Sequence, residues 1–418
     1  MFDIDSWQEI WITITRNKTR SFLTCFGVFW GILMLVLLLG AGNGLERGMF
    51  KNVDGFAAKS CFFWNDQTSE PYKGFKKGRS WSMRNRDLDI LRQKVKGIEY
   101  LSPMIWGARP ANNVVYEDKS ATHGVRGVYP DFFKIEAQYI KAGRLINDID
   151  IMDKRKVCLI GTRVSDNLFK SYDEAIGKYI RVNGIYYQVA GVIKAKPKAN
   201  IGGRTEDSVI LPITTLQQTG NFGDVFHFLC VTALPEYTTN DISGKIMDVL
   251  KANNQIAPND TQAVGTISFE NQFKTFEYLF IGIATLIWIV GLGTLLAGVI
   301  GVSNIMLVTV RERTREIGVR RALGATPKNI LLQIMNESLL ITSAAGLLGL
   351  VLGVAILDGI SQIMMMNPSD DSFIEPPTIS ISVALYATAV LLMSGLLSGL
   401  IPAWRALQIK AIDAIRDE

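Results

Sequence analysis

The sequence has 418 residues, of which 48% are hydrophobic and 20% are charged, and its formal net charge is +5 at pH 7. This composition is apolar for a soluble protein but too polar for a chain that lies wholly in a membrane. It therefore predicts several spanning helices together with one sizeable aqueous domain. The basic residues are not gathered into one tract, which argues against nucleic-acid binding. The four cysteines form no CxxC pair, which argues against a zinc site or a dense disulfide scaffold.

The first residues have the pattern of an amphipathic helix. Ser6 and Glu9 fit a capping box. Four apolar residues then recur with the spacing of one helical face: Trp7, Ile10, Trp11 and Ile14. Tryptophans followed by cations favour a helix that lies on the cytoplasmic surface of a membrane. We therefore predict an interfacial helix over residues 1–20, with an ordinary packed amphipathic helix as the alternative.

Four long uncharged runs follow, and each can supply the roughly 20 apolar residues that a spanning helix needs. They occupy residues 21–45, 279–310, 338–357 and 376–404. The first run is too long for a cleaved signal peptide, and no cleavage site follows it. We predict transmembrane helices over residues 21–42, 329–357 and 379–402, and a stalk with a further transmembrane helix over residues 276–310.

The charges that flank these runs predict their orientation. Cations precede the first run, crowd the link between the second and third, and follow the fourth, whereas residues 358–378 contain no Lys or Arg. Short loops rich in Lys and Arg stay in the cytoplasm. We therefore predict that both termini, including the tail 403–418, and the loop 311–328 are cytoplasmic. Residues 43–275 and the short loop 358–378 then lie outside.

The densest charge lies in RERTREIGVRRALGATPKNI, residues 311–330. Glu316 precedes Arg320 by four positions, the favourable order for a helical ion pair, and Glu312 precedes Arg315 by three. Such pairs stabilise an exposed helix by only about 0.2–0.5 kcal/mol, so they do not explain why the charge is there. Six basic residues crowd the stretch: Arg311, Arg313, Arg315, Arg320, Arg321 and Lys328.

The same stretch predicts a helix, a sharp turn and a second helix. We expect the second spanning helix to continue through Leu323 and to stop at Gly324. Thr326 is a good N-cap, and Pro327 suits the first turn of the next helix. The cations either only hold the loop in the cytoplasm or form a docking surface for a cytoplasmic partner. The order of Glu316 and the arginines on one rigid turn favours docking.

The long segment between the first two runs alternates strand-like and helix-like stretches. KSCFFWN, IEYLSPMIW, FHFLCVTAL and VGTISFE predict strands, and RNRDLDILRQKV and TNDISGKIMDVLKAN predict helices. VNGIYYQVAGVI predicts a hairpin around Asn183 and Gly184. Two βαβ-like halves, 43–108 and 226–275, thus bracket a β-rich insertion, 109–225. The only two histidines, His123 and His227, are expected to be structural.

Inside the runs, two features predict how the helices pack. Glu337 lies near the membrane edge of the third run, where it is either functional or extends to the aqueous interface. Small residues at four-residue spacing allow close helix approach. These are Gly293, Ala297 and Gly301 in the second run, Ala345, Gly349 and Gly353 in the third, and Gly395 and Gly399 in the fourth.

RERTREIGVRRALGATPKNILLQIMNESLL resembles the cytoplasmic loop of the MacB/FtsX-like ABC transporter permeases, whose typical form is R-x-R-E-I-G-x-R-R-A-L-G-A. RNKTRSFLTCFGVFWGI and PAWRALQIKAIDAIRDE resemble the opening and closing segments of that family. VCLIGTRVSDNLF and AIGKYIRVNGIYYQVAGVIKAK resemble the MacB-type periplasmic core. The resemblance covers nearly the whole chain.

The resemblance implies an α-helical membrane protein with four transmembrane helices and a large extracytoplasmic α/β domain. That domain is a porter-like split βαβ module with a Sabre-like β-rich insertion. Loop 311–328 would be the coupling helix that seats on an ATPase subunit, and the long second helix would transmit its motion. The residues that match the motif are Arg313, Arg315, Glu316, Ile317, Gly318, Arg320, Arg321, Ala322, Leu323 and Gly324. Arg311, two residues before the motif, is included in the expected ATPase-coupling set.

The resemblance also implies the activity. The chain would be a non-catalytic permease subunit of the inner membrane that couples ATP hydrolysis to movements of its outer domain and drives efflux from the periplasmic side. It contains no G-x-x-x-x-G-K-[ST] phosphate loop. We therefore expect no fused ATPase domain and no cofactor in this chain, with ATP and Mg²⁺ bound by a separate ATPase. A homodimer, a periplasmic adaptor and an outer-membrane channel are further implied partners. A lipoprotein-extracting permease and an FtsX-like regulator of a cell-wall hydrolase are the alternatives.

Overall fold

The structure is a computed structural model, and it describes residues 18–107, 112–196, 202–366, 375–378 and 381–408. The chain forms two compact units. The helical unit comprises residues 1–49 and 278–418, and the α/β unit comprises residues 50–277. The predicted interfacial helix and most of the predicted C-terminal tail lie outside the described residues.

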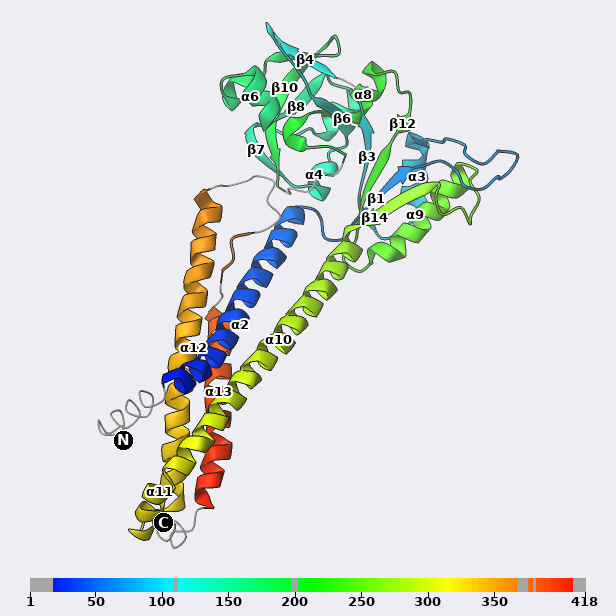
Figure 1. Ribbon diagram of the computed structural model, residues 1–418. Helices are drawn as coiled ribbons and strands as arrows, with labels where there is room; N and C mark the ends of the chain where they lie inside the picture. The colour runs from blue at the N-terminus through cyan, green and yellow to red at the C-terminus, as the bar shows by residue number, and fades with distance from the viewer. Residues whose placement is uncertain (1–17, 108–111, 197–201, 367–374, 379–380, 409–418) are drawn as a thin grey trace. The chain divides into compact units, whose positions relative to one another are not determined.

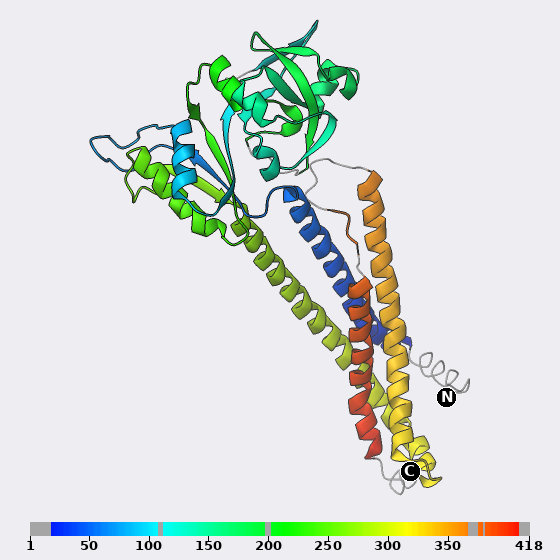
Figure 2. The same cartoon turned by 180° about the vertical axis from the view of Figure 1, so that it is seen from behind.

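Among the described residues, the helical unit contains four long helices and one short helix, which can be followed in Figures 1 and 2. The long helices are α2 (Lys18–Val53), α10 (Phe269–Glu312), α12 (Pro327–Met366) and α13 (Ile381–Leu407), and the short one is α11 (Thr314–Ala322). Each long helix contains a stretch that is long and apolar enough to cross a membrane. The predicted number of spanning helices is therefore confirmed for the described part of the chain.

Two helix ends differ from the sequence prediction. Helix α12 runs to Met366 rather than ending at residue 357. Asp358 ends the apolar run but not the helix, because its carboxylate accepts a hydrogen bond (2.9 Å) from Gln362 one turn later. The second crossing does not continue through the charged loop as one helix, since α10 and α11 are separate helices with Arg313 between them.

Glycines let the long helices approach one another closely. A Cβ atom at Gly298 of α10 would lie 2.9 Å from the amide nitrogen of Val28 in α2. One at Gly399 of α13 would lie 3.0 Å from the Cβ atom of Ser338 in α12. Within the described chain, the close approach of α10 is made at Gly298 and not at the predicted Gly293 or Gly301, where a Cβ would meet no described atom within 4 Å. Four-residue spacing identifies stripes of small residues but not which stripe faces a neighbour.

One half of the α/β unit is a four-stranded antiparallel sheet with two helices. It contains β1 (Ser60–Asn65), α3 (Asn85–Lys94), β3 (Ile98–Trp106), β13 (Phe228–Ala233), α9 (Thr239–Asn253) and β14 (Val264–Ser268). The strand order is β14-β1-β13-β3, which is the split βαβ arrangement. The predicted split module is therefore confirmed.

The other half continues the same sheet as β6-β11-β8-β10-β9-β4-β5, with β7 paired to β10. Residues Asn183 (φ 48°) and Gly184 (φ 87°) form the turn of the predicted β9–β10 hairpin, which is confirmed. A separate pair joins β2 to β12. The strands are β2 (Met83–Arg84), β4 (Asn113–Tyr116), β5 (Lys119–Thr122), β6 (Gly124–Val128), β7 (Gln138–Gly143), β8 (Val157–Gly161), β9 (Tyr179–Val182), β10 (Ile185–Ala195), β11 (Ser208–Pro212) and β12 (Val225–Phe226). Short helices connect them: α4 (Phe132–Ile135), α5 (Asp148–Met152), α6 (Thr162–Leu168), α7 (Tyr172–Ala175), η1 (Thr205–Asp207) and α8 (Ile213–Thr219).

The cysteines of the α/β unit are buried free thiols on both faces of the sheet. Cys61 and Cys158 lie in the core that contains α3 and α9, whereas Cys230 lies in the opposite core. Burial raises the pKa of Cys61 to about 12 and also raises the pKa values of Cys158 and Cys230. His227 stacks on Trp106 at a ring-centroid distance of 5.6 Å.

A buried charged pair joins strand β6 to the segment after α4. Arg126 is the largest fully buried side chain, and its Nη2 atom lies 3.8 Å from Oε1 of Glu136. The same carboxylate oxygen accepts hydrogen bonds of 2.8 Å from the Thr205 hydroxyl and of 2.8 Å from the Gln138 amide. Burial raises the pKa of Glu136, although Arg126 and these hydrogen bonds oppose it.

A loop of residues 66–82 projects from the α/β unit between β1 and β2 (Figure 1). Its base is fixed by Asp260, whose buried carboxylate accepts five hydrogen bonds. The donors are the Ser69 amide (2.7 Å) and hydroxyl (2.8 Å) and the amides of Glu70 (3.2 Å), Gln262 (3.0 Å) and Ala263 (3.0 Å). Burial alone would raise the pKa of Asp260, but these bonds outweigh it and lower the pKa to about 2.

Candidate functional site

The charged stretch forms a helix–turn–helix at one end of the helical unit. Helix α10 ends at Glu312, and Arg313 has φ −98° and ψ 14°, outside the regular helical geometry. The Thr314 hydroxyl donates to the carbonyl oxygens of Val310 (3.3 Å) and Arg311 (2.7 Å). Threonine side chains that bond to the preceding turn compete with the helical ladder and can bend helices. Thr342 makes the same pair of bonds inside the continuous helix α12, so these bonds accompany the break but do not by themselves locate it.

The second turn of the stretch follows the sequence prediction. Gly324 has φ +99°, a left-handed conformation that favours glycine. Helix α12 then begins at Pro327. The main-chain amides of Asn329 (3.0 Å) and Ile330 (3.4 Å) donate to the carbonyl oxygen of Thr326.

The face of α11 that contains Ile317 and Gly318 packs inward. Gly318 is buried, and Ile317 is half-buried against the apolar cluster that includes Ile330 and Ile334 of α12. A small cavity of about 30 Å³ lies at this contact, enough for one or two water molecules. Its other walls include Met306 of α10.

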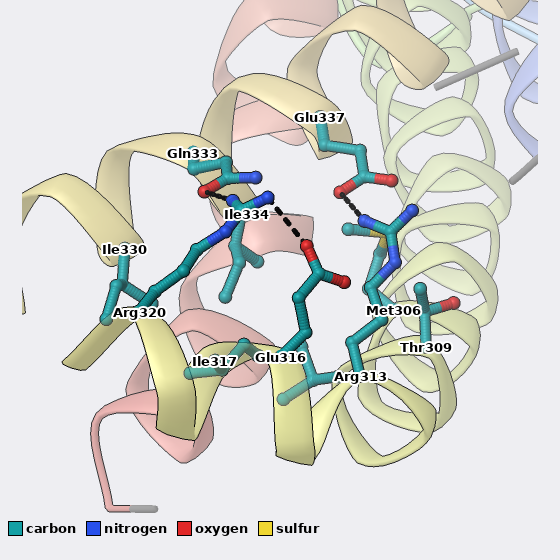
Figure 3. A pocket seen from close by; sticks show the side chains of 11 residues that line it. Met306, Thr309, Arg313, Glu316, Ile317, Arg320, Ile330, Gln333, Ile334 and Glu337 are labelled. Carbon is teal, nitrogen blue, oxygen red and sulfur yellow. Dashed lines mark hydrogen bonds and ion pairs between the residues drawn. The ribbon is translucent and has the colours of Figure 1, made fainter. Parts of the chain in front are cut away.

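Polar contacts surround this cavity and connect α11 to α12 (Figure 3). Arg320 Nη2 lies 2.6 Å from Glu316 Oε1, so the predicted helical pair forms, and Arg320 Nη1 donates to Gln333 Oε1 (2.9 Å). Arg313 Nη1 lies 3.6 Å from Glu337 Oε2. The Glu337 side chain is only 8% exposed, so it faces inward rather than extending to the aqueous interface.

The remaining contacts divide α11 into a packed face and an exposed face. Arg321 Nη1 donates to the carbonyl oxygen of Leu407 at the end of α13 (3.0 Å). Arg315 is exposed, as are the apolar side chains of Val319 (42%) and Leu323 (83%). Apolar side chains that point away from the bundle, beside charges, have the composition of an interface.

The structure gathers some of the predicted site residues and separates others. Five of them line the cavity, namely Arg313, Glu316, Ile317, Arg320 and Glu337, whereas Arg311, Arg315, Leu323 and Gly324 are exposed. Ile317 packs against α12 and is not part of the exposed face. The prediction missed Val319 and Gln333. Gln333 and Glu337 are four residues apart on α12, so a search for polar residues on one face of that helix would have found them together.

Two family models match adjacent parts of the chain. The MacB-like periplasmic core domain matches residues 21–249, and the FtsX-like permease C-terminal domain matches residues 275–411. The chain belongs to the MacB/FtsX-like ABC transporter permease family. Family membership makes it a membrane protein with an extracytoplasmic domain and confirms the resemblance drawn from the charged loop.

Several relatives of this permease carry the same name, macrolide export ATP-binding/permease protein MacB. The one from Syntrophobacter fumaroxidans is 23% identical, over 97% of this chain and 62% of the relative. Those from Acinetobacter baylyi and Neisseria gonorrhoeae are 25% and 28% identical, over 99% and 97% of this chain and 60% of each relative. The permease thus spans about three fifths of the length of these relatives.

Among solved structures, the permease is similar to the periplasmic region of MacB from Actinobacillus actinomycetemcomitans. The sequences are 16% identical, the match covers 55% of this chain and 97% of that structure, and the TM-score is 0.43.

Proposed function

We propose that this permease is the membrane-spanning subunit of an exporter, and that a separate cytoplasmic ATPase docks on the exposed face of α11. The observation that carries this proposal is the exposed apolar pair Val319 and Leu323 beside Arg315, on a helix whose other face contacts α12 through Ile317 and Arg320. Cations that only fix topology need no such apolar pair. Arginine is enriched among the residues that carry most of the binding energy of an interface, and the contacts around such residues exclude water from them, which is a role that Val319 and Leu323 can fill beside Arg315.

Family membership supports the rest of the proposal. ATP and Mg²⁺ bind the ATPase, and its closure displaces α11 and so moves the extracytoplasmic domain. The working assembly is a homodimer in the inner membrane, with the termini in the cytoplasm and with a periplasmic adaptor and an outer-membrane channel on the other side. The relatives are named for macrolide export, so macrolides are the first substrates to test, in cells that express this permease with its ATPase.

The docking proposal is tested with surface variants of α11. Leu323→Asp and Arg315→Glu change exposed side chains without touching the cavity, so the helical unit should fold and insert normally. An opposed charge or an unpaired carboxylate at an interface costs several kcal/mol, so co-purification with the ATPase should weaken by about tenfold or more.

Lys328→Ala is the matched control, because Lys328 is an exposed cation of the same stretch that lies beyond α11. It should leave the complex intact. If Leu323→Asp and Arg315→Glu retain the ATPase as well as Lys328→Ala does, α11 is not the docking surface.

The orientation is tested by labelling single introduced cysteines in intact cells. A cysteine at Lys76, in the exposed loop of the α/β unit, should react with a membrane-impermeant reagent, whereas one at Lys328 should not. The native thiols of the α/β unit should contribute little background because they are buried. Labelling of position 328 from outside the cell would show that the proposed orientation in the membrane is wrong.

A further inference from the structure

Helix α11 and the residue before it, Arg313, are tied to α12 at two separate levels. Arg320 reaches Gln333, and one turn further along α12 Arg313 reaches Glu337. Between these contacts Ile317 packs against Ile334 (Figure 3). Polar contacts are directional, so two of them at different heights oppose both sliding and rotation of α11 against α12.

Helix α12 is in turn joined to α13. The Ser338 hydroxyl lies 2.5 Å from that of Ser398 and 3.3 Å from the carbonyl oxygen of Gly395. The Gly399 position brings the two backbones together, since a Cβ there would lie 3.2 Å from the Cα atom of Met335. Arg321 adds a direct link from α11 to α13. Helices α11, α12 and α13 are therefore connected pairwise by hydrogen bonds.

Helix α10 meets the same region in a different way. Met306 and Val310 line the cavity with apolar atoms, and the Thr309 hydroxyl donates to Ile305 within its own helix (3.1 Å). Apolar contacts are non-directional and permit sliding. The main chain connects α10 to α11 through Arg313, whose ψ of 14° departs from helical geometry, although its amide still donates to Thr309 (3.0 Å) and its carbonyl oxygen still accepts from Ile317 (3.0 Å). This is the geometry of a hinge, where a few element-terminal residues absorb a change in backbone angle.

We propose that α11, α12 and α13 move as one rigid block, that the break at Arg313 is a hinge to α10, and that Glu337 is the positioning residue that fixes α11 to the block. This inference deepens the proposed function, because it rests on a partner that displaces α11. A displacement of α11 together with Arg313 away from α12 would separate the Arg313–Glu337 pair, and breaking a buried pair is strongly unfavourable. The motion therefore passes to α12 and α13, and the angle between α10 and α12 changes.

The block is tested in the purified full-length chain in lipid nanodiscs by spin-label distance measurements. One label pair, at Val319 and Leu332, spans α11 and α12; the other, at Val319 and Ile300, spans α11 and α10. All three positions are exposed. Cys25 is replaced by alanine, and the three buried thiols of the α/β unit react slowly because burial raises their pKa values. The α11–α12 distances should be narrowly distributed and the α11–α10 distances broad.

Glu337→Gln removes the charge and keeps the size of the side chain, so the α11–α12 distribution should become as broad as that between α11 and α10. Glu337→Asp keeps the charge and should restore part of the narrowness. Asp358→Asn is the matched control, because it neutralises an exposed carboxylate of the same helix that accepts from a glutamine, and it should change nothing. The proposal would be overturned if the two label pairs gave equally wide distance distributions in the wild type. It would also be overturned if the α11–α12 distribution in Glu337→Gln were as narrow as in the wild type.

A second measurement uses the complex with the ATPase that co-purifies in the docking experiment. ATP with vanadate should change the distance between labels at Ile300 and Leu332 in the wild type. Glu337→Gln should retain the ATPase yet lose that change, because docking and transmission use opposite faces of α11. If the distance between these labels changes in Glu337→Gln as much as it does in the wild type, the role proposed for Glu337 is wrong. Whether an ATPase binds at all, and whether Leu323→Asp abolishes that binding, tests only the proposed function. The widths of the distance distributions in the isolated chain test separately whether α11, α12 and α13 form a rigid block.

Discussion

Each unit of the protein contains an arginine–glutamate pair with a buried carboxylate, and the two pairs differ in how they are enclosed. Arg126 and Glu136 lie 3.8 Å apart in the α/β unit, with side chains 1% and 3% exposed. Arg313 and Glu337 lie 3.6 Å apart in the helical unit, with side chains 24% and 8% exposed. The separations are similar, so the difference lies in the surroundings.

The enclosed pair has additional partners that hold it in place. Thr205 and Gln138 donate to the Glu136 carboxylate, and Arg126 also donates to the Thr205 hydroxyl. These groups come from separate segments of the fold, so the pair fastens the sheet to the loops around it. The pair in the helical unit joins Arg313, the residue between α10 and α11, to α12 beside a small cavity, and the Arg313 side chain stays 24% exposed. An arginine–glutamate pair therefore fixes a domain when both side chains are enclosed, and connects movable elements when one of them stays accessible.

The largest effect is expected from breaking the enclosed pair. Glu136→Ala leaves the buried Arg126 guanidinium without its carboxylate, and removing one partner of a buried pair typically costs about 3–5 kcal/mol. The α/β unit should lose this much stability, measured by amide hydrogen exchange of its strands in the full-length chain. Arg84→Ala is the control, because it breaks the exposed pair with Asp224, and exposed pairs contribute only about 0–1 kcal/mol. Equal effects of the two variants would remove the distinction between enclosed and open pairs.

A double replacement tests whether the enclosed pair stabilises the α/β unit by itself or only avoids a single buried charge. Arg126→Met together with Glu136→Leu removes both charges and keeps much of the volume, and such swaps are often neutral or stabilising. The double variant should therefore be more stable than Glu136→Ala alone. If it is less stable, the hydrogen bonds to Thr205 and Gln138 contribute more than the avoidance of a single buried charge.

An intermediate effect is expected at Asp260, a buried carboxylate held by hydrogen-bond donors rather than by an arginine. Asp260→Asn places an amide N–H₂ group opposite amide donors, and an unsatisfied buried donor costs about 1–3 kcal/mol. The loop of residues 66–82 should lose amide protection at neutral pH.

The pH dependence of the wild type follows from the pKa of Asp260. This pKa of about 2 lies below the ordinary value of 3.8, so the folded state binds fewer protons than the unfolded state. The stabilisation is therefore present above the ordinary value and declines as the pH falls toward 2.

The control for this pH dependence is the variant itself. Protection of the Ser69 and Glu70 amides, corrected for intrinsic exchange, should fall with acidification in the wild type and stay flat in Asp260→Asn. A flat wild-type profile would show that the carboxylate charge is not what holds the loop.

Much of the fold could be predicted from local patterns. Apolar runs of sufficient length predict the four spanning helices, and period-two and helical patterns predict the split βαβ half, because both signals belong to single elements. The turn at Gly324 was predictable for the same reason, since a left-handed conformation restricts one residue.

The contacts that give the candidate site its shape were not predictable in this way. Arg313 and Glu337 meet because the end of α10 lies beside α12, where Met306 and Val310 line the same cavity, and the sequence does not show which helices are neighbours. The Thr314 hydroxyl bonds that accompany the break compete weakly with the helical ladder, and no period reveals them. Likewise Arg126, Glu136 and Thr205 lie on separate segments, and a cluster of this kind depends on tertiary packing. The sequence therefore predicts which stretch is charged but not which of its charges face inward.

The smallest effect is expected at the exposed pair of α11. Glu316 and Arg320 are 2.6 Å apart with side chains 43% and 41% exposed, which makes this the open extreme of the comparison. Exposed helical pairs contribute about 0.2–0.5 kcal/mol, and salt screens them. A double-mutant cycle of Glu316→Ala and Arg320→Ala, measured by thermal unfolding of the helical unit, should therefore give a coupling within that range. The coupling should shrink further at high salt. Arg320 also donates to Gln333, so Arg320→Ala alone should cost more than Glu316→Ala alone, and a cycle with Gln333→Ala separates that contribution. A Glu316–Arg320 coupling of several kcal/mol that salt does not screen would mean that this pair behaves like the enclosed pair of Arg126 and Glu136. Burial would then not distinguish charges that fix the structure from charges that remain accessible to a partner.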